Sequence, residues 1–358
     1  MRHKTPKLRG LSIRPLRNVA GEAMNRVVRR IAAQSSDPVG TVLLNLYQVS
    51  HETPHAQFHD TALGLLKCLI PFDFAKWGSS HLSSQGVIFH EAHLHQEPPE
   101  IMEAYTHVYH EDSAARWVAR NLGITANFHN PTVFAGERHR AIRDYTRRYR
   151  HANALITGRR DPRTGLMHSL SLYRADPERT YTERERRLCQ FLVPHCAQAL
   201  VINRMLQVEQ VRRPDSPGTV AMAIADPFGT LHFAEPAFLA LVRSEWMGFE
   251  GATLPSPLQL AFLGSGPCRF LGRTLLLSWM SCKGLYFLRA RQRLPVDSLT
   301  PRELAIAREV SAGLTHKEIA RKLGIAPATV RNHLNLIHER SHARNNAELA
   351  AQLRLAGY

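Results

Sequence analysis

The C-terminal part of the chain, 295–358, has the clearest helical pattern. Thr300 and Thr315 are each followed three residues later by a Glu, a pairing that satisfies the unpaired amide groups at a helix start. Gly313 and Gly324 stand where the first two helices should end. The spacing predicts four helices, which begin at Pro301, His316, Pro327 and Asn346, the third running to about His338 and the last to Leu355.

The predicted third helix has two different faces. Val330, Leu334 and Ile337 recur at helical spacing and form an apolar face. The other face carries polar side chains, at Thr329, Arg331, Asn332 and Asn335. A short helix, a tight turn and a helix with polar donors near its start form a helix-turn-helix, whose second helix fits the major groove of duplex DNA.

The region 36–211 has a mixed helical and extended pattern. Residues 39–49 and 61–69 are apolar at helical spacing, and 86–91 alternates like a strand. Two further strands, 152–157 and 169–174, are joined by a turn sequence at 161–165. A capping pair, Thr182 and Glu185, then begins a long helix through 206 that Pro194 should kink. The pattern predicts an α+β domain closed by a long helix.

The region 219–291 predicts a second, smaller α+β domain, preceded by a linker at 210–218. Strands at 220–225 and 230–233 flank a tight turn at 226–229. A helix at 236–246 and strands at 273–280 and 284–289 complete the predicted domain.

Three segments of the C-terminal part carry a family resemblance: Leu-Thr-Pro-Arg-Glu at 299–303, Gly-Leu-Thr-His-Lys-Glu-Ile-Ala at 313–320, and Ala-Thr-Val-Arg-Asn-His-Leu at 328–334. They resemble the C-terminal DNA-binding domain of LuxR-type transcriptional regulators. The resemblance implies that Thr329, Arg331, Asn332 and Asn335 face the bases. It also implies that Thr315, Lys317 and His333 lie near the phosphates. The chemistry agrees, because Arg pairs well with guanine and Asn with adenine, whereas Lys suits phosphate.

Three positions depart from the family pattern. Ala326 stands where the recognition helix usually has a Ser cap, a loss that costs roughly 1 kcal/mol. Ser341 and His342 replace a usual Leu-Gly, and Asn346 replaces a frequent Arg. These changes predict weaker packing of the last helix, which in several relatives helps to form a dimer.

The two upstream regions resemble sensor domains. Region 36–211 is similar to a GAF-like sensor, on its hairpin, its capped long helix and the run Leu-Val-Pro-His-Cys-Ala-Gln-Ala-Leu at 192–200. Region 219–291 resembles a shortened PAS-like domain and shows no cofactor-attachment motif. The predicted organisation is therefore multidomain: a basic extension at 1–35, an α+β GAF-like domain, an α+β PAS-like domain and an all-α LuxR-type domain at 295–358.

The chain has 358 residues and a formal charge of +16, which favours a polyanionic partner. Residues 1–30 supply nine Lys or Arg against one Glu, half of that charge. This segment is expected to be disordered. It is interpreted as a DNA-clinging arm, a helix on anionic lipid or, most simply, a solvated tail from a start upstream of Met24. The DNA-binding interpretation therefore rests on the motif more than on the charge.

The five cysteines are odd in number and form no Cys-x-x-Cys pair, which indicates reduced thiols in a cytosolic protein. No apolar run approaches the roughly 20 residues that cross a bilayer. The N-terminus lacks the apolar stretch of a signal peptide. A cytoplasmic location is predicted.

Four residues invite comparison with the lactone-binding domains of quorum-sensing LuxR proteins, and are candidates for an effector pocket: Tyr105, Tyr109, Asp112 and Trp117. Those domains have an Asp-Pro pair and an upstream Trp. Here Ser113 follows the Asp and the upstream Trp is missing. An acyl-homoserine lactone receptor is therefore the alternative function, and plain helix packing of the aromatic residues is the simpler interpretation.

Other chemistry finds little support in the sequence. His51, His55 and His59 have helical spacing and His90, His93 and His95 form a cluster, yet Pro54 interrupts the first set and no Cys or carboxylate repeats at ligand spacing. We expect no metal, haem or other cofactor. No phospho-receiver pattern, nucleotide-binding P-loop or signature of a catalytic nucleophile is present, so an enzyme is not expected.

The sequence thus predicts a DNA-binding transcription regulator under the control of its sensor domains. Its expected partners are double-stranded DNA, a second copy of the chain, an unknown small-molecule effector and, as a candidate, RNA polymerase. One helix-turn-helix reads few base pairs, so a homodimer on a pseudo-palindromic site is expected. The effector, the target genes and the direction of regulation stay open.

Overall fold

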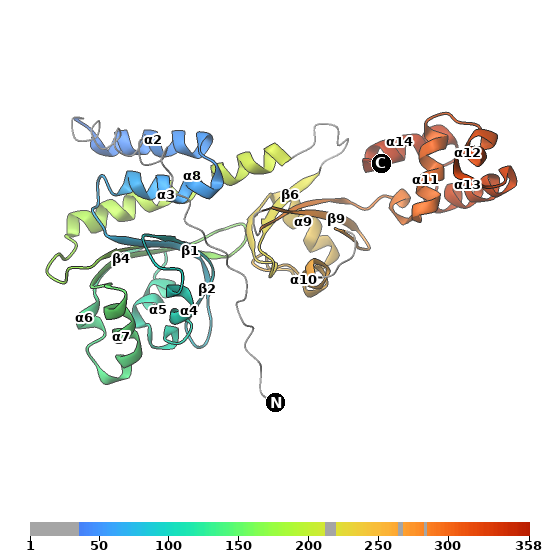
Figure 1. Cartoon of the computed structure of the whole chain (residues 1–358). Coiled ribbons are helices and arrows are strands. Elements are labelled where there is room, and N and C mark those ends of the chain that lie inside the picture. The colour runs from blue at the N-terminus through green and yellow to red at the C-terminus, as the bar shows by residue number, and fades with distance from the viewer. Residues whose placement is uncertain (1–35, 212–219, 264–267, 283–284) are drawn as a thin grey trace. The chain divides into compact units, whose positions relative to one another are not determined.

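The computed structural model describes residues 36–211, 220–263, 268–282 and 285–358. By its contacts the chain divides into two compact units, Met1–Gln207 and Val208–Tyr358 (Figure 1). The predicted basic extension, 1–35, and most of the predicted linker lie outside the described residues. Among the helices that the structure describes, none combines the length and apolar character that a bilayer crossing requires.

The first unit is built on a five-stranded sheet in which all neighbouring strands are antiparallel. The strands lie in the order β2-β1-β5-β4-β3. Their bounds are Phe74–Leu82 for β1, Val87–His95 for β2, Thr125–His129 for β3, Asn153–Arg160 for β4 and Met167–Arg174 for β5. The predicted hairpin between β4 and β5 is confirmed, and its turn holds Gly165 at a φ of 73°, which favours glycine.

Helices cover both faces of this sheet (Figure 1). One face is covered by α2 (Pro38–Glu52), α3 (His55–Leu66) and α8 (Glu183–Val211). The other is covered by α4 (Ile101–Tyr105), α5 (Ser113–Arg120), α6 (Asn130–Val133) and α7 (Arg140–Arg148), with short 3-10 turns η1 (Tyr109–Glu111) and η2 (Glu137–His139). Each face has its own apolar core, the first around Phe58, Leu66 and Leu172 and the second around Ile101 and Phe134.

The long helix α8 begins where the sequence predicts. Thr182 N donates to Glu185 Oε2 at 2.8 Å and Glu185 N donates to Thr182 Oγ1 at 3.2 Å, which closes the capping box. Pro194 lies inside the helix.

Two strands of this sheet were not predicted from the sequence. In β1, six consecutive residues from Ala75 to Ser80 are buried, so no alternation of apolar and polar side chains marks the strand. In β3, a strand of five residues, polar side chains at Thr125 and Asn127 interrupt the apolar pattern. The sheet pairs strands that are distant in the sequence, such as β1 with β5.

The second unit begins with another five-stranded antiparallel sheet, in the order β7-β6-β10-β9-β8. Its strands are β6 (Ala221–Ala225), β7 (Leu231–Ala234), β8 (Arg269–Leu271), β9 (Leu275–Cys282) and β10 (Leu285–Gln292), and its helices are α9 (Pro236–Glu245) and α10 (Ser256–Leu263). Alanine and leucine side chains of the strands pack against Phe238 and Phe262 to form its core. The predicted strands and α9 are present here, whereas α10 and β8 were not predicted.

The C-terminal helices are η3 (Pro295–Ser298), α11 (Pro301–Ser311), α12 (His316–Leu323), α13 (Pro327–Ser341) and α14 (Asn346–Ala356). Ile306, Ile319, Val330, Ile337 and Leu349 are buried in one core, and burying each such side chain contributes roughly 1.5–3 kcal/mol. The prediction of α+β regions followed by an all-α domain is confirmed at this level.

Candidate DNA-binding surface and ligand cavity

Helices α11 and α12 are closed by the predicted capping boxes. Thr300 N donates to Glu303 Oε2 at 2.9 Å, and Glu303 N donates to Thr300 Oγ1 at 3.3 Å. Thr315 and Glu318 repeat the same two bonds at 2.7 Å and 3.4 Å. Gly324 then ends α12 in the left-handed conformation, with a φ of 64°. The short connection to Pro327 presents α13 as the second helix of a helix-turn-helix.

Helix α13 has the two predicted faces. Val330, Leu334 and Ile337 are buried. The side chains of the opposite face are exposed, at Thr329, Arg331, Asn332 and Asn335. None of these four side chains forms a hydrogen bond or ion pair with another residue that the structure describes. Their donors and acceptors are therefore open to a ligand outside the domain.

The residues predicted near phosphate differ in what they can offer. Lys317 is exposed and has no ion pair within the described part of the chain. Thr315 is exposed, but its hydroxyl donates to Glu318 Oε2 at 2.7 Å and is held by the helix cap. His333 is half-buried, and its Nδ1 has no hydrogen-bond partner among the described residues. Of the three, Lys317 thus presents an exposed cationic donor.

The departures from the family pattern have visible consequences. Ala326 makes no side-chain bond to the start of α13. Ser341 is fully buried at the end of α13, where its Oγ accepts a long bond of 3.4 Å from Ala343 N. Arg340 donates to both carboxylate oxygens of Glu303 at 2.8 Å and ties α13 to α11. This ion pair lies near the C-terminal end of α13, whereas the side-chain cap is missing at the N-terminal end of the same helix.

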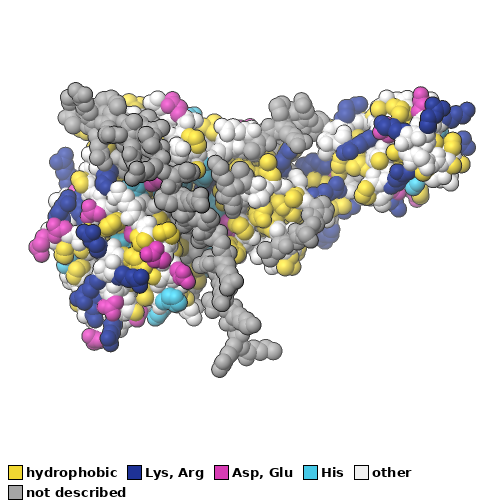
Figure 2. All heavy atoms as spheres, viewed as in Figure 1, with side chains coloured by type: hydrophobic (Ala, Val, Ile, Leu, Met, Phe, Trp, Pro, Cys, Tyr) yellow, Lys and Arg dark blue, Asp and Glu magenta, His cyan; other side chains and the backbone are white. Residues whose placement is uncertain are grey.

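Positive side chains are spread over the C-terminal helices. Figure 2 shows Lys and Arg in dark blue on the visible face of this domain. Its residues 295–358 hold nine Lys or Arg against six Asp or Glu. The modest excess suits a surface that approaches phosphates without binding them by charge alone.

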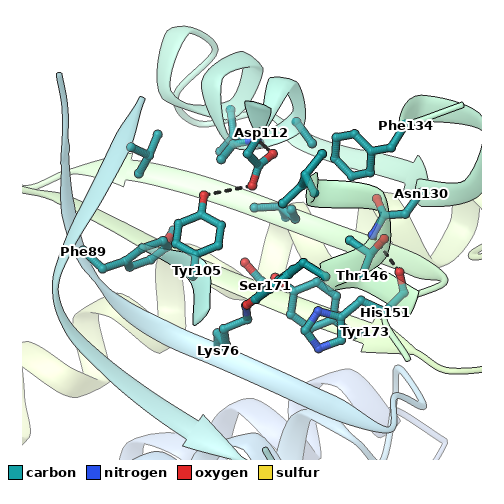
Figure 3. Close-up of a pocket in the computed structure, with 18 of the residues that line it drawn as sticks. Lys76, Phe89, Tyr105, Asp112, Asn130, Phe134, Thr146, His151, Ser171 and Tyr173 are labelled. Carbon is teal, nitrogen blue, oxygen red and sulfur yellow. Dashed lines mark hydrogen bonds between the residues drawn. The ribbon is translucent and has the colours of Figure 1, made fainter. Parts of the chain in front are cut away.

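A second candidate site is a cavity of about 50 Å³ in the first unit (Figure 3). Its walls come from the sheet and from the helices α4 to α7. The sheet contributes Lys76, Val87, Phe89, Ile156, Met167, Ser169, Ser171 and Tyr173; the helical side contributes Tyr105, Asp112, Ala114, Ala115, Val118, Asn130, Phe134, Ile142, Tyr145, Thr146 and His151.

Polar groups around the cavity are joined in pairs. Tyr105 Oη donates to Asp112 Oδ2 at 2.9 Å, and Asp112 Oδ1 accepts from Ala115 N at 2.8 Å, which also caps α5. Lys76 Nζ donates to Tyr145 Oη at 3.0 Å. Figure 3 shows Asp112 and Phe134 on the helical side of the cavity and Lys76, Ser171 and Tyr173 on the side of the sheet.

A further pair lies beside Lys76. His151 Nε2 is 2.5 Å from Glu97 Oε1, and the His151 ring stacks on Tyr173 with centroids 3.8 Å apart. Both side chains of the His151–Glu97 pair are 1% exposed. A buried acid and a buried base are thus in contact beside the cavity, and His151 of this pair lines its wall.

Burial shifts the ionisation of these groups. It lowers the pKa of Lys76 to about 8, although the charges of Glu97 and Asp112 act in the opposite direction. It raises the pKa of Glu97 to about 7, against the attraction of Lys76. The pKa of His151 falls well below its ordinary value through burial and the nearby Lys76 charge. The imidazole is therefore neutral.

Only part of the predicted effector set lines this cavity. Tyr105 and Asp112 do. Tyr109 instead donates from its hydroxyl to Gln85 Oε1 at 2.7 Å, and Trp117 is 41% exposed and lies edge-on to Phe128. Sequence reasoning missed Lys76, whose one visible signal is a lone lysine inside the apolar run Phe-Ala-Lys-Trp-Gly at 74–78.

Several of the predicted histidines meet in space. His93 Nε2 and His95 Nδ1 lie 3.0 Å and 2.8 Å from Asp60 Oδ1, and the rings of His59 and His93 stack 4.9 Å apart. His90 instead stacks on His81. Among the described residues, no group of three or more His, Cys, Asp or Glu side chains is arranged to hold a metal ion.

The C-terminal domain matches a known family. Residues 297–353 match the family model of bacterial regulatory proteins, luxR family. Over 60 residues the chain is 40% identical to a nitrate/nitrite response regulator protein homolog of Haemophilus influenzae. That match covers 16% of this chain, which spans only 29% of the relative's length. The C-terminal domain is a LuxR-type helix-turn-helix domain.

Solved structures of LuxR-type proteins show a weaker likeness. The N-acylhomoserine lactone dependent factor CepR2 of Burkholderia cenocepacia is 16% identical, with 47% of this chain and 98% of that chain covered and a TM-score of 0.36. SdiA in complex with octanoyl-rac-glycerol is 12% identical over 95% of this chain and 97% of that chain, with a TM-score of 0.31. The VqsR ligand-binding domain of Pseudomonas aeruginosa is 17% identical over 46% and 94%, with a TM-score of 0.33. Likenesses of this size transfer no ligand or assembly to this chain.

Proposed function

We propose that the chain is a sequence-specific DNA-binding regulator of transcription whose N-terminal domains sense a small molecule. The observation that carries the proposal is the exposed face of α13, where Arg331, Asn332 and Asn335 have no partner among the described residues, in a domain of the LuxR type. A buried apolar face on the same helix holds these side chains outward.

The polar face can distinguish bases. Arg331 suits the paired acceptors of guanine, and Asn332 or Asn335 suits the donor and acceptor of adenine. Thr329 is short and lies at the start of the helix, where it reaches a thymine methyl or a phosphate. Lys317, near the start of α12, and His333 are assigned to phosphates, and Thr315 approaches the backbone beside them.

We assign a sensor role to the regions upstream. In this proposal 36–211 is a GAF-like domain, 219–291 is a PAS-like domain and 295–358 binds DNA. The cavity beside Lys76 takes the effector, which is a small molecule. Binding changes the relative populations of two arrangements through α8 and the segment 289–298. The effector can do this only if it binds the two arrangements with different affinity.

A homodimer on a pseudo-palindromic site follows from the small footprint of one helix-turn-helix, with half-site centres about one DNA turn apart. In this proposal the protein acts in the cytoplasm as a regulator rather than an enzyme, and RNA polymerase is a candidate partner at the promoter.

An acyl-homoserine lactone remains the second candidate for the effector. The bond of 2.9 Å between Tyr105 and Asp112, at the wall of the cavity, favours it. The cavity of about 50 Å³ is far smaller than the roughly 300 Å³ or more typical of drug-sized ligands. A lactone with an acyl chain would therefore need a more open conformation of the cavity, whereas a smaller ligand would not need one.

The test is selection of bound sites from a random duplex pool by the full-length protein, beside Arg331→Ala. We expect an inverted-repeat motif, and a loss of about 1–3 kcal/mol with relaxed preference at one base position in the variant. Arg344→Ala is the matched control, because Arg344 is exposed on the same domain but lies beyond the end of α13. Binding without any motif, equal in all three proteins, would contradict the proposal.

Lys317→Ala separates phosphate contacts from base contacts. Loss of one phosphate contact should weaken binding to every sequence and lower the slope of affinity against salt by about one. Affinity measured for the selected and a scrambled duplex at several salt concentrations gives both numbers. If the variant changed base preference instead, the roles assigned to Lys317 and Arg331 would be reversed.

A further inference from the structure

Lys76 is an unusual residue for its position. The chain contains 46 Lys and Arg, of which seven are Lys. Among the lysines that the structure describes, Lys317 and Lys322 are exposed, Lys67 is half-buried and Lys76 is 6% exposed. A chain that relies on arginine for most of its cations places a lysine at the wall of its cavity. Lysine differs from arginine in that it can lose its proton and act as a nucleophile.

The hydrogen bonds of this ammonium group are incomplete. It has three donor hydrogens, and the one acceptor it has among the described residues is Tyr145 Oη, at 3.0 Å. The rings of Tyr105, Tyr145 and Tyr173 lie 5.6, 5.3 and 5.2 Å from Nζ. Such rings stabilise a cation but accept no conventional hydrogen bond. A buried donor without an acceptor is costly, so the group is suited to a partner that enters the cavity.

The charges around Lys76 limit what that partner can be. The carboxylates of Asp112 and Glu97 already act on the lysine. An anionic ligand would meet the Asp112 carboxyl group, which lines the cavity, in a medium of low dielectric constant. A neutral ligand with an oxygen acceptor brings no such repulsion.

We propose that Lys76 binds a small aldehyde or ketone inside this cavity as a covalent, reversible imine. The proposal rests on the proposed role of the cavity as the effector site, and it names the class of effector. Apolar side chains such as Val87, Phe89 and Phe134 would receive the alkyl part of the ligand.

The chemistry balances without any other reactant. The Nζ lone pair forms a bond to the carbonyl carbon, and the carbonyl oxygen takes a proton to give a carbinolamine. Loss of that hydroxyl as water leaves a protonated imine. One water is released, nothing is oxidised or reduced, and the positive charge of the ammonium is kept by the iminium. The three tyrosine rings and the two carboxylates therefore retain a cation at the same place.

Several neighbours can assist these steps. Burial gives Lys76 a pKa of about 8, so roughly a tenth of the side chain is free amine at neutral pH. Tyr145 Oη, at 3.0 Å from Nζ, is placed to pass a proton between the nitrogen and the carbonyl oxygen. The size of the cavity, about 50 Å³, corresponds to a few water molecules and favours a carbonyl compound of few carbons.

The experiment is reductive trapping in the full-length protein with propanal and sodium cyanoborohydride at pH 7, followed by peptide mass mapping. We expect a propyl group on Lys76 that appears roughly tenfold or more faster than on the exposed Lys317 and Lys322, because the lowered pKa of Lys76 leaves more of its free amine at this pH. The small number of lysines lets each site be followed separately. Labelling of Lys76 at the rate of the exposed lysines, or no labelling, would overturn the proposal.

Three variants sharpen the result. Lys76→Arg keeps the cation but cannot form an imine, so the label on this peptide should vanish. Tyr145→Phe removes the hydroxyl beside Nζ and should slow the labelling of Lys76 while leaving Lys322 unchanged. Lys67→Arg is the matched control and should label Lys76 like the parent protein. If Lys76 were labelled at the parent rate in Tyr145→Phe, the proposed proton transfer by Tyr145 would be wrong. In Lys76→Arg, labelling of the other lysines at the parent rate shows that the reagents are active.

The outcome is separable from that of the DNA-binding test. If Lys76 is trapped rapidly but the protein selects no DNA motif, the imine is supported and the proposed function as a sequence-specific DNA-binding regulator is contradicted. A selected motif with no preferential trapping would do the reverse.

Discussion

The two sheets of this chain have one layout and two different interiors. Counted from the first strand of each, both follow the order 2-1-5-4-3 and are antiparallel throughout. In the first sheet Lys76 of the first strand pairs with Ser171 of the central strand, at the wall of a cavity. In the second sheet the corresponding strands pair Ala223 with Leu288, and both are fully buried in an apolar core.

The comparison teaches that the fold alone does not make the binding site. The same strand order supports an apolar core when its inward residues are alanine and leucine. It supports a cavity with polar groups in its wall when a lysine, two serines and one tyrosine take such places. The helical side then supplies Tyr105, Tyr145 and Asp112. The difference between the two interiors is therefore tested directly by replacing Lys76 or by placing a lysine in the second sheet.

The largest effect is expected when the lysine is placed in the second sheet. Ala223→Lys would bury an ammonium group among apolar side chains without the carboxylates and tyrosines that surround Lys76. An unpaired buried charge should cost about 3–5 kcal/mol or more. Hydrogen exchange of β6 and β10 in the full chain measures this loss, with Ala223→Val as the control for size. Unchanged protection in Ala223→Lys would show that the second interior accepts a cation as easily as the first.

The next effect concerns the pH dependence of the first unit. A lysine whose pKa falls from 10.5 to about 8 on folding destabilises the folded state below pH 8, and this penalty is relieved as the pH rises through 8 toward 10.5. Lys76→Met removes the penalty at all pH values. Its advantage in free energy of unfolding over the parent should therefore shrink by on the order of 2 kcal/mol between pH 8 and pH 10.

Urea unfolding followed by tryptophan fluorescence at the two pH values measures that difference. Comparing variant with parent cancels the titration of other groups, such as Cys189, whose pKa burial raises to about 11. Lys67→Met, at a half-buried lysine of the same unit, controls for the exchange of a lysine for a methionine. A difference that stays constant from pH 8 to pH 10 would mean that Lys76 keeps an ordinary pKa.

The smallest effect is expected from Asp112→Asn. Asparagine caps a helix about as well as aspartate, so the free energy of unfolding should change by about 1 kcal/mol or less. The charge of Asp112 raises the pKa of Lys76, so its loss should lower that pKa further. The midpoint of Lys76 trapping against pH should move down, and should not move in Glu103→Gln, a change at an exposed carboxylate of α4. An unmoved midpoint in Asp112→Asn would show that this carboxylate does not act on the lysine.

Local sequence predicted the C-terminal domain well because its signals are short-range. The pairs Thr300–Glu303 and Thr315–Glu318 and the left-handed Gly324 each act within a few residues, and the structure shows all of them. The same holds for the hairpin between β4 and β5 and for the cap of α8. The predicted roles of Arg331, Asn332 and Asn335 toward DNA stay predictions, although the exposure of these side chains is what the roles require.

The cavity could be predicted only in part. Tyr105 and Asp112 are close in sequence and belong to the set that the family pattern predicts. Tyr109 and Trp117 belong to the same set but do not line the cavity. Lys76 lies in β1, which has no alternation to mark it as a strand. Its neighbour Tyr145 is 69 residues away along the chain. No periodicity in one segment can report such a contact.

The sequence by itself determined where the helices of the C-terminal domain begin and end, and which face of α13 is polar, because caps, glycines and helical spacing are properties of neighbouring residues. Only the tertiary structure decided that a lysine of β1, an aspartate before α5, a tyrosine of α7 and His151 meet around one cavity. That meeting depends on the order of the strands and on burial. Burial also shifts the pKa values of these groups, because a pKa depends on the medium and the charges around a group and not on its place in the chain.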